Sequence, residues 1–216
     1  MNSTKLARRA HKLLQKSLPD LQFGHDLLFL SPVEHILRCF ALERIFIPKG
    51  DAYFWRVVMP LYRPSPALVV NYGERLLGGE RVSLLDAELD RTIERLAQVV
   101  RGGELERLNE VRTPKQFLQH VKWEELPSTP NYRIDLALTH YLAGDAVACQ
   151  EVLDELVARP PNPRWGKEIK LAQEMAQEAR ENPSALTRRI EAWEQDTRTW
   201  LHLFPRSRRR TRAASG

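Results

Sequence analysis

Cysteines and long apolar runs are scarce in this chain of 216 residues. The two cysteines, Cys39 and Cys149, lie far apart in apolar stretches, so we expect buried, reduced thiols and no disulfide framework. No apolar run approaches the roughly 20 residues that a membrane-spanning helix needs. Basic residues interrupt the first apolar positions, which is unlike a signal peptide. These absences predict a cytoplasmic protein with no transmembrane segment.

Motifs of enzymes and metal sites are also lacking. The Gly-Gly pairs at 78–79 and 102–103 have neither the spacing nor the lysine of a phosphate-binding loop. There is no Gly-x-Ser-x-Gly elbow, and the six histidines are scattered. The sequence therefore favours a protein that is not an enzyme and predicts no cofactor and no metal. An enzyme of unrecognised type is the alternative.

Three short patterns resemble fragments of metal sites. His35 and Cys39 would share a face on a helix, but a zinc site needs three or four ligands and no nearby residue completes the set. The His-Asp pair at 25–26 lacks the further ligands of a metal phosphohydrolase. The Glu-Ile-Lys segment at 168–170 falls on a predicted helix, whereas the corresponding nuclease signature lies on a strand. We interpret the three as a packed cysteine, a turn and a solvated helix face.

Charge is distributed unevenly along the chain. Residues 1–16 and 206–216 carry five basic side chains each and no acid, whereas residues 17–205 hold 23 basic and 28 acidic side chains, a net charge of −5. The chain thus has an acidic body and two basic ends. The C-terminal end, which we expect to be disordered over 205–216, is a candidate site for nucleic acid or another anion, with an idle tail as the alternative. Its basic residues are Arg206, Arg208, Arg209, Arg210 and Arg212.

The periodicity of apolar residues predicts an α+β fold. Residues 4–17 match an amphipathic helix that packs on a sheet, with a surface or targeting helix as the alternative. A small antiparallel meander follows, rich in aromatic and β-branched residues. Its strands are predicted over 38–47, 52–62 and 67–73, with an optional edge strand over 21–30, and residues 33–40 fit a strand or a helix.

The rest of the chain has the pattern of helices. These are predicted from an N-cap at Ser83 to residue 101, over 104–111, from Thr113, and over 132–143, 145–158, 165–181 and 184–203. The proline-rich linker at 126–130 divides the prediction into an α/β portion over 1–126 and a helical appendage over 131–204, followed by the basic tail.

Two parts of the chain resemble known proteins. The pattern Ala137…Tyr141-Leu-Ala-Gly-Asp145…Pro160 resembles one tetratricopeptide-type helical hairpin over about 132–160, without a second copy at the period of 34 residues. The resemblance implies helix–helix packing and protein binding. The segments 54–64, Phe-Trp-Arg-Val-Val-Met-Pro-Leu-Tyr-Arg-Pro, and 71–76, Asn-Tyr-Gly-Glu-Arg-Leu, look like a family of uncharacterised bacterial α+β proteins over about 25–160. That resemblance implies the fold and carries over no functional residue.

Aromatic residues lie beside arginines in the predicted sheet. On a strand, Tyr53 and Trp55 would share one face, and Phe54 and Arg56 the other. Such pairs can form a binding patch for protein or stacked bases, and core packing is the alternative. The candidate interaction surface is Arg56, Arg63, Asn71, Glu74 and Arg75.

The function predicted first is a non-enzymatic protein-interaction role of the immunity, adaptor or assembly-factor type, with another protein as partner. The alternative is a nucleic-acid-associated protein that uses its basic N- and C-terminal segments. The sequence does not indicate an oligomeric state.

Overall fold

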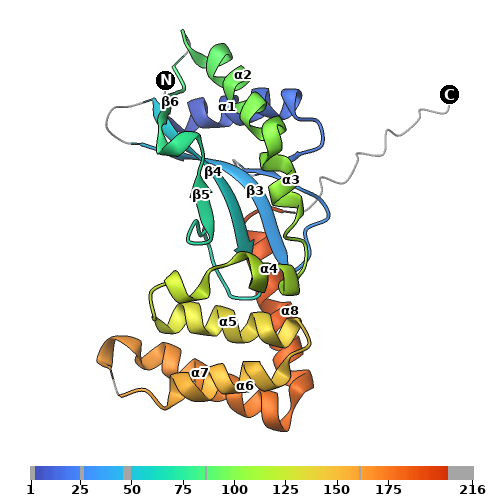
Figure 1. Cartoon of the computed structure of the whole chain (residues 1–216), viewed down its shortest axis with the longest axis vertical. Coiled ribbons are helices and arrows are strands. Elements are labelled where there is room, and N and C mark those ends of the chain that lie inside the picture. Colours follow the sequence, from blue (N-terminus) through green and yellow to red (C-terminus); the bar gives the residue numbers. More distant parts are fainter. Residues whose placement is uncertain (1–2, 25–26, 46–49, 86, 161, 204–216) are drawn as a thin grey trace, which may run out of the picture.

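The structure is a computed structural model that describes residues 3–24, 27–45, 50–85, 87–160 and 162–203 (Figure 1). The predicted α+β fold is confirmed: an N-terminal helix precedes an antiparallel sheet, and a helical half follows. Helix α1 (Ser3–Ser17) lies at one end of the molecule, the sheet in the middle, and α5 (Pro130–Leu142), α6 (Ala146–Val157) and α7 (Gly166–Glu181) at the other end. No helix of the described residues is both long enough and apolar enough to cross a membrane.

In the described residues, six strands form one antiparallel sheet in the order β1-β2-β3-β4-β5, and β6 also pairs with β4. They are β1 (Gln22–Gly24), β2 (Leu27–Phe29), β3 (Ile36–Arg44), β4 (Asp51–Pro60), β5 (Gly73–Arg75) and β6 (Arg81–Ser83). The ambiguous residues 33–40 therefore lie mostly in a strand, and residues 21–30 contain a short hairpin.

The strand predicted over 67–73 is wrong, because pairing with β4 begins only at Gly73. The preceding residues form a loop, and Leu68, Val69 and Val70 pack across one face of the sheet. Their apolar side chains thus cover the sheet and do not extend it, so strand-like composition was misleading here.

The side chains of the sheet alternate between two faces, as the strand period requires. One face, which we call the covered face, packs against α1 and against α2 (Leu89–Val99) through a single apolar core. Its buried residues are Leu28, Phe40, Leu42, Phe54 and Val58. The predicted apolar stripe of α1 is buried in the same core through Leu6, Ala10 and Leu14.

The opposite face, which we call the open face, has a smaller core of its own. Leu27, Phe29, Cys39, Val57 and Met59 are buried there. The loop at 68–70 and two residues beyond the end of α8 (Pro183–Trp200), Leu201 and Leu203, cover them. Only part of this face is covered in this way.

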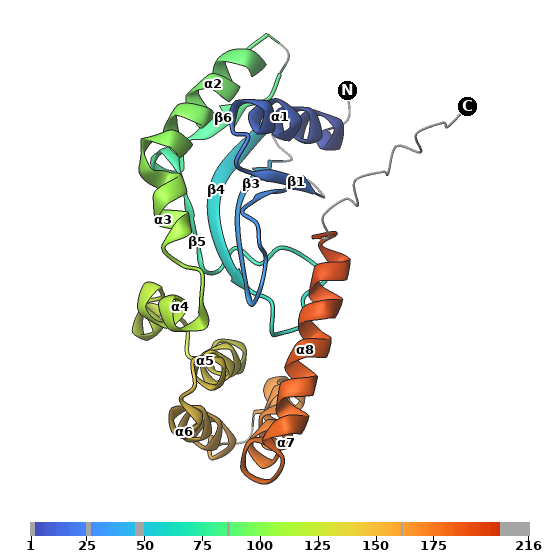
Figure 2. The same ribbon diagram turned by 90° about the vertical axis from the view of Figure 1, so that its right-hand side faces the viewer.

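The chain then descends along the covered face (Figure 2). Helix α2 begins at Leu89, not near Ser83, which belongs to β6. It continues through a π-helical turn (Val100–Glu104), in which Gly103 has a φ of +121°, into α3 (Leu105–Asn109). Helix α4 (Pro114–His120) starts at the predicted position. Its Thr113 and Gln116 form a reciprocal capping box, which satisfies backbone N–H groups at the helix start.

The helical half packs α5 on α6 and α6 on α7. A tight turn joins α5 and α6, and Gly144 adopts a φ of +88° there, a conformation that favours glycine. Helix α8 runs from this layer back along the sheet (Figure 2). The main core is continuous from Leu6 of α1 to Ile190 of α8. The division near residues 126–131 stays a prediction.

Candidate functional site

The five residues of the predicted interaction surface lie in three separate places. Arg75 lies on the open face. Arg56 and Glu74 lie on the covered face, where Nη2 of the arginine is 2.6 Å from Oε2 of the glutamate. Arg63 lies at the junction between the sheet and α5, and Asn71 is exposed in the loop before β5. The structure therefore does not form one surface from these residues, and each place has its own partners.

Around Arg75, two rows of cross-strand neighbours form a partly exposed area of the open face. The first row runs from Glu43 of β3 through Tyr53 of β4 to Arg81 of β6. In the second row, Trp55 of β4 lies opposite Arg75 of β5. We call these five residues the open-face patch.

The side chains of the open-face patch contact one another. The guanidinium carbon of Arg75 lies 4.0 Å from the ring centroid of Tyr53 and 4.8 Å from that of Trp55. The indole N–H of Trp55 donates to Oε2 of Glu43 at 2.8 Å, and Arg75 donates to the same oxygen at 3.3 Å. Arg81 donates to the hydroxyl of Tyr53 at 3.4 Å. These contacts restrict the rotamers of the patch, which lowers the entropy that a binding event would cost.

The open-face patch stays accessible because the cover of this face stops short of it. Trp55 packs against the open-face core and is half-buried, and Tyr53 is half-buried as well. The side chains of Arg75 and Glu43 are 43% and 45% exposed. An aromatic platform with arginines has the composition of the residues that dominate binding energy in protein interfaces.

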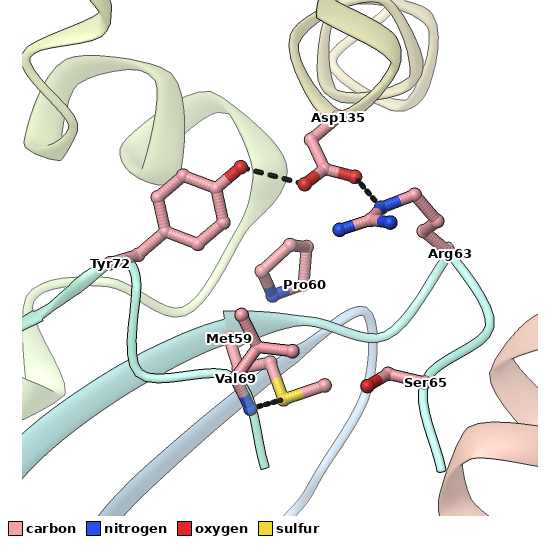
Figure 3. Close-up of a pocket in the computed structure, with 7 residues that line it drawn as sticks. All are labelled: Met59, Pro60, Arg63, Ser65, Val69, Tyr72 and Asp135. Carbon is pink, nitrogen blue, oxygen red and sulfur yellow. Dashed lines mark hydrogen bonds and ion pairs between the residues drawn. The ribbon is translucent and has the colours of Figure 1, made fainter. Parts of the chain in front are cut away.

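Arg63 belongs to a buried cluster at the junction of the sheet and the helical half (Figure 3). Asp135 of α5 reaches down between two partners: its Oδ1 accepts from Nε of Arg63 at 2.5 Å, and its Oδ2 accepts from the hydroxyl of Tyr72 at 2.6 Å. The residue is only 1% exposed. The cluster thus joins α5 to both ends of the loop that follows β4.

Burial and pairing shift the pKa of Asp135 in opposite directions. Burial raises the pKa of Asp135, and the Arg63 guanidinium and the Tyr72 hydroxyl oppose that rise. Burial, followed by the negative charge of Asp135, raises the pKa of Tyr72. The adjoining cavity has a volume of about 10 Å³, close to the minimum that holds one water molecule. With both oxygens of Asp135 paired and a cavity too small for a substrate, the cluster is a structural contact between α5 and the loop after β4.

Three further polar contacts hold α8 against loops beside the sheet. Nδ1 of His35 lies 2.6 Å from Oε1 of the buried Glu194, and this hydrogen bond raises the pKa of His35. Arg198 donates to the carbonyl of Glu34 at 2.5 Å, and Thr197 accepts from the backbone N–H of Ser65 at 3.3 Å. His35 is therefore a docking contact for α8.

Arg56 also connects two elements of the fold, here on the covered face. Its Nη1 lies 2.5 Å from Oε2 of Glu104, and both side chains are largely buried, at 10% and 15% exposed. Glu74, its second partner, is 62% exposed. Burial, together with the nearby Arg56, lowers the pKa of His120. This pair links the middle of β4 to the turn before α3.

The short patterns that resemble metal sites do not form a metal site among the described residues. Within the described ranges, no group of three or more His, Cys, Asp and Glu side chains could hold a metal ion. Cys39 is buried in the open-face core, and burial raises its pKa. Burial raises the pKa of Cys149 to about 12. The segment at 168–170 lies on α7. The pair at 25–26 and the arginines from residue 206 onward lie outside the described residues.

Sequence reasoning missed residues that only the register brings into place. Glu43 and Arg81 lie on other strands than Tyr53 and join it only through strand pairing. Asp135 had a weak signal, because it sits between Ile134 and Ala137 on a helix face that is otherwise buried. An acid in such a position requires a partner, although the sequence does not identify it.

In three comparisons with known proteins, no family model, no curated protein and no solved structure matches this chain.

Proposed function

We propose that this protein has a non-enzymatic protein-interaction role, of the immunity, adaptor or assembly-factor type, and that it acts in the cytoplasm. The open-face patch is its binding surface. The observation that supports this is the stacking of Arg75 over Tyr53 and Trp55 on an exposed sheet face. Tyrosine, tryptophan and arginine are the residue types that most often dominate binding energy in protein interfaces.

The charges of the patch favour a particular kind of partner. Arg75 and Arg81 outnumber the single carboxylate of Glu43, which already accepts from Trp55. A partner that presents carboxylates around an apolar centre would pair with the arginines and cover the rings. Arginine binds carboxylates through two parallel hydrogen bonds, which fixes the orientation of the partner as well as its affinity.

The test compares two charge reversals of exposed arginines. Arg75→Glu reverses a charge in the patch, whereas Arg95→Glu reverses a charge on α2, where the arginine also pairs with a surface glutamate, Glu80. Each purified full-length variant is immobilised, incubated with lysate of the source cells and washed, and the stoichiometry of retained proteins is measured.

We expect wild type and Arg95→Glu to retain one protein in stoichiometric amount and Arg75→Glu to lose it. Thermal unfolding of all three proteins shows whether Arg75→Glu is folded. Retention of the same partner by folded Arg75→Glu would contradict the proposal, and so would the absence of any stoichiometric partner of the wild type. If Arg75→Glu does not fold, Trp55→Leu, which keeps the charges and an apolar contact, gives the same comparison.

A further inference from the structure

The N-terminal helix presents a surface of a different kind from the open-face patch. All five basic residues of α1 are exposed, and the helix contains no acid. They are Lys5, Arg8, Arg9, Lys12 and Lys16. At 100° per residue they fall within an arc of about 100° on the helix circumference, so they form one stripe. From Lys5 to Lys16 the stripe is about 16 Å long at 1.5 Å per residue.

The other side of α1 is fixed in the protein. Leu6, Ala10 and Leu14 are buried in the main core, and so is Leu18, one residue beyond the end of the helix. The helix therefore cannot turn its apolar side to a lipid bilayer, as interfacial helices do. The exposed stripe holds no aromatic residue on which a single-stranded base could stack. The stripe offers a straight row of cations on a rigid support.

We propose that the basic stripe of α1 binds the phosphate backbone of double-helical nucleic acid, independently of sequence. A duplex carries one negative charge per about 1.7 Å of its axis, so 16 Å of axis spans about nine phosphates. A rigid row of cations matches this regular row of anions better than it matches a flexible single strand. Lysine and arginine without base-reading side chains give contacts that position the protein and read no sequence.

The acidic body of the chain, residues 17–205, limits where a polyanion can approach. Residues 17–205 have a net charge of −5, which repels a polyanion. Helix α1, which carries the stripe, lies at the end of the molecule opposite α5–α7 (Figures 1 and 2). Asp90 and Glu94 of α2 line a groove beside Lys16, so we expect the phosphate contacts to be strongest toward Lys5 and Lys12.

The experiment measures binding of the full chain to a fluorescent 20-base-pair duplex of arbitrary sequence by anisotropy, with DNA and RNA duplexes as parallel probes. The stripe variant replaces Lys5, Lys12 and Lys16 with glutamine, which keeps helix propensity and removes three charges. The control variant makes the same change in net charge on the far helices with Lys167→Gln, Lys170→Gln and Arg188→Gln, all of which are exposed.

At about 0.1 M salt we expect the stripe variant to bind at least about 100-fold more weakly than wild type, and the slope of log K against log salt to become shallower by about 2, up to about 2.7 if Lys16 contacts a phosphate fully. The control variant should change the affinity by less than about 3-fold, since its residues do not touch the duplex. Equal weakening by the two variants would show a general charge effect and would overturn the proposal.

Two further measurements separate the stripe from other anion-binding modes. Deletion of residues 206–216 tests the tail, and the proposal fails if this deletion abolishes duplex binding while the stripe variant does not weaken it. Vesicles of neutral lipid, with and without about one-third phosphatidylserine, test a membrane surface. Binding to anionic vesicles without binding to the duplex would also overturn the proposal. Neither result depends on whether Arg75→Glu loses a protein partner.

Discussion

Arg56 and Arg75 lie on paired strands, yet they point to opposite faces of the sheet and have opposite surroundings. Arg56 is 10% exposed and contacts carboxylates of Glu104 and Glu74 at 2.5 and 2.6 Å. Arg75 is 43% exposed, stacks on two aromatic rings and shares one surface carboxylate at 3.3 Å. A buried guanidinium requires neutralising partners because the protein interior solvates it poorly, whereas an exposed one keeps its water and remains available.

This difference between buried and exposed arginines indicates two roles for charged residues in this fold. The buried pairs, Arg56–Glu104 and Arg63–Asp135, hold elements together, and removal of one partner leaves a charge buried alone. The contacts of the open-face patch arrange side chains at the surface and add little to stability. Substitutions at both kinds of position test this division, because stability and binding should respond separately.

The largest loss of stability is expected for Asp135→Ala. This change leaves the guanidinium of Arg63 and the hydroxyl of Tyr72 without their carboxylate at a buried junction. We expect the free energy of unfolding, measured by urea denaturation, to fall by about 3–5 kcal/mol. Tyr72→Phe, which removes one hydrogen bond and keeps the ion pair, should cost about 1–2 kcal/mol. A loss below about 1 kcal/mol for Asp135→Ala would mean that the junction does not hold the two halves together.

Arg56→Ala should have a smaller effect, because one of its two partners is at the surface. The largely buried carboxylate of Glu104 loses its partner within the fold, although Arg107 also lies 3.0 Å from its other oxygen. We expect a loss of about 2–3 kcal/mol in the urea unfolding experiment. Glu74→Ala is the control and should cost less than about 1 kcal/mol, since the side chain of Glu74 is 62% exposed. Equal losses for the two variants would contradict the role assigned to burial.

The sequence was sufficient for the elements with a clear period. The sequence correctly predicted the apolar stripe of α1, the alternation along β4 and the start of α4 at a proline. Each of these features depends only on residues that are close together in the sequence. Residues 67–72 were misread as strand because β-branched side chains serve equally to cover a sheet, and composition does not distinguish the two uses.

The sites were harder to predict than the elements. Alternation placed Trp55 and Arg56 on opposite faces, but it did not say which face the helices would cover. Glu43, Arg75 and Arg81 come together only through the pairing of three different strands with β4. The buried partner of Arg63 is 72 residues away, on a helix of the other half. Such contacts depend on tertiary packing, which the local pattern does not encode.

On the open face, Arg75→Ala should leave stability almost unchanged. Its stacking and its exposed contact with Glu43 contribute less than about 1 kcal/mol together at a solvated site. Urea unfolding should therefore give nearly the wild-type free energy, while retention of the protein partner is reduced. A loss of stability as large as that of Arg56→Ala would show that Arg75 has a structural task, and would remove the contrast between the two faces.

The smallest effect is expected at His35, a histidine that is half-exposed beside the buried carboxylate of Glu194. Its surroundings are intermediate between those of Arg56 and Arg75. The hydrogen bond with Glu194 raises the pKa of His35, aided by the charge of Glu34 and opposed by burial and by Arg198. Protonation therefore favours the folded state. This contribution is complete below the unfolded value of about 6.5 and is lost as the pH rises through the folded pKa.

The advantage of wild type over His35→Gln should accordingly be larger at about pH 5.5 than at about pH 8.5, by less than about 1 kcal/mol. Urea midpoints of both proteins at the two pH values measure it, and the subtraction removes the titration of groups that the two proteins share. If the difference between the proteins is the same at both pH values, the pair with Glu194 acts as a neutral hydrogen bond. His35 would then contribute no more charge-dependent stability than Arg75 does.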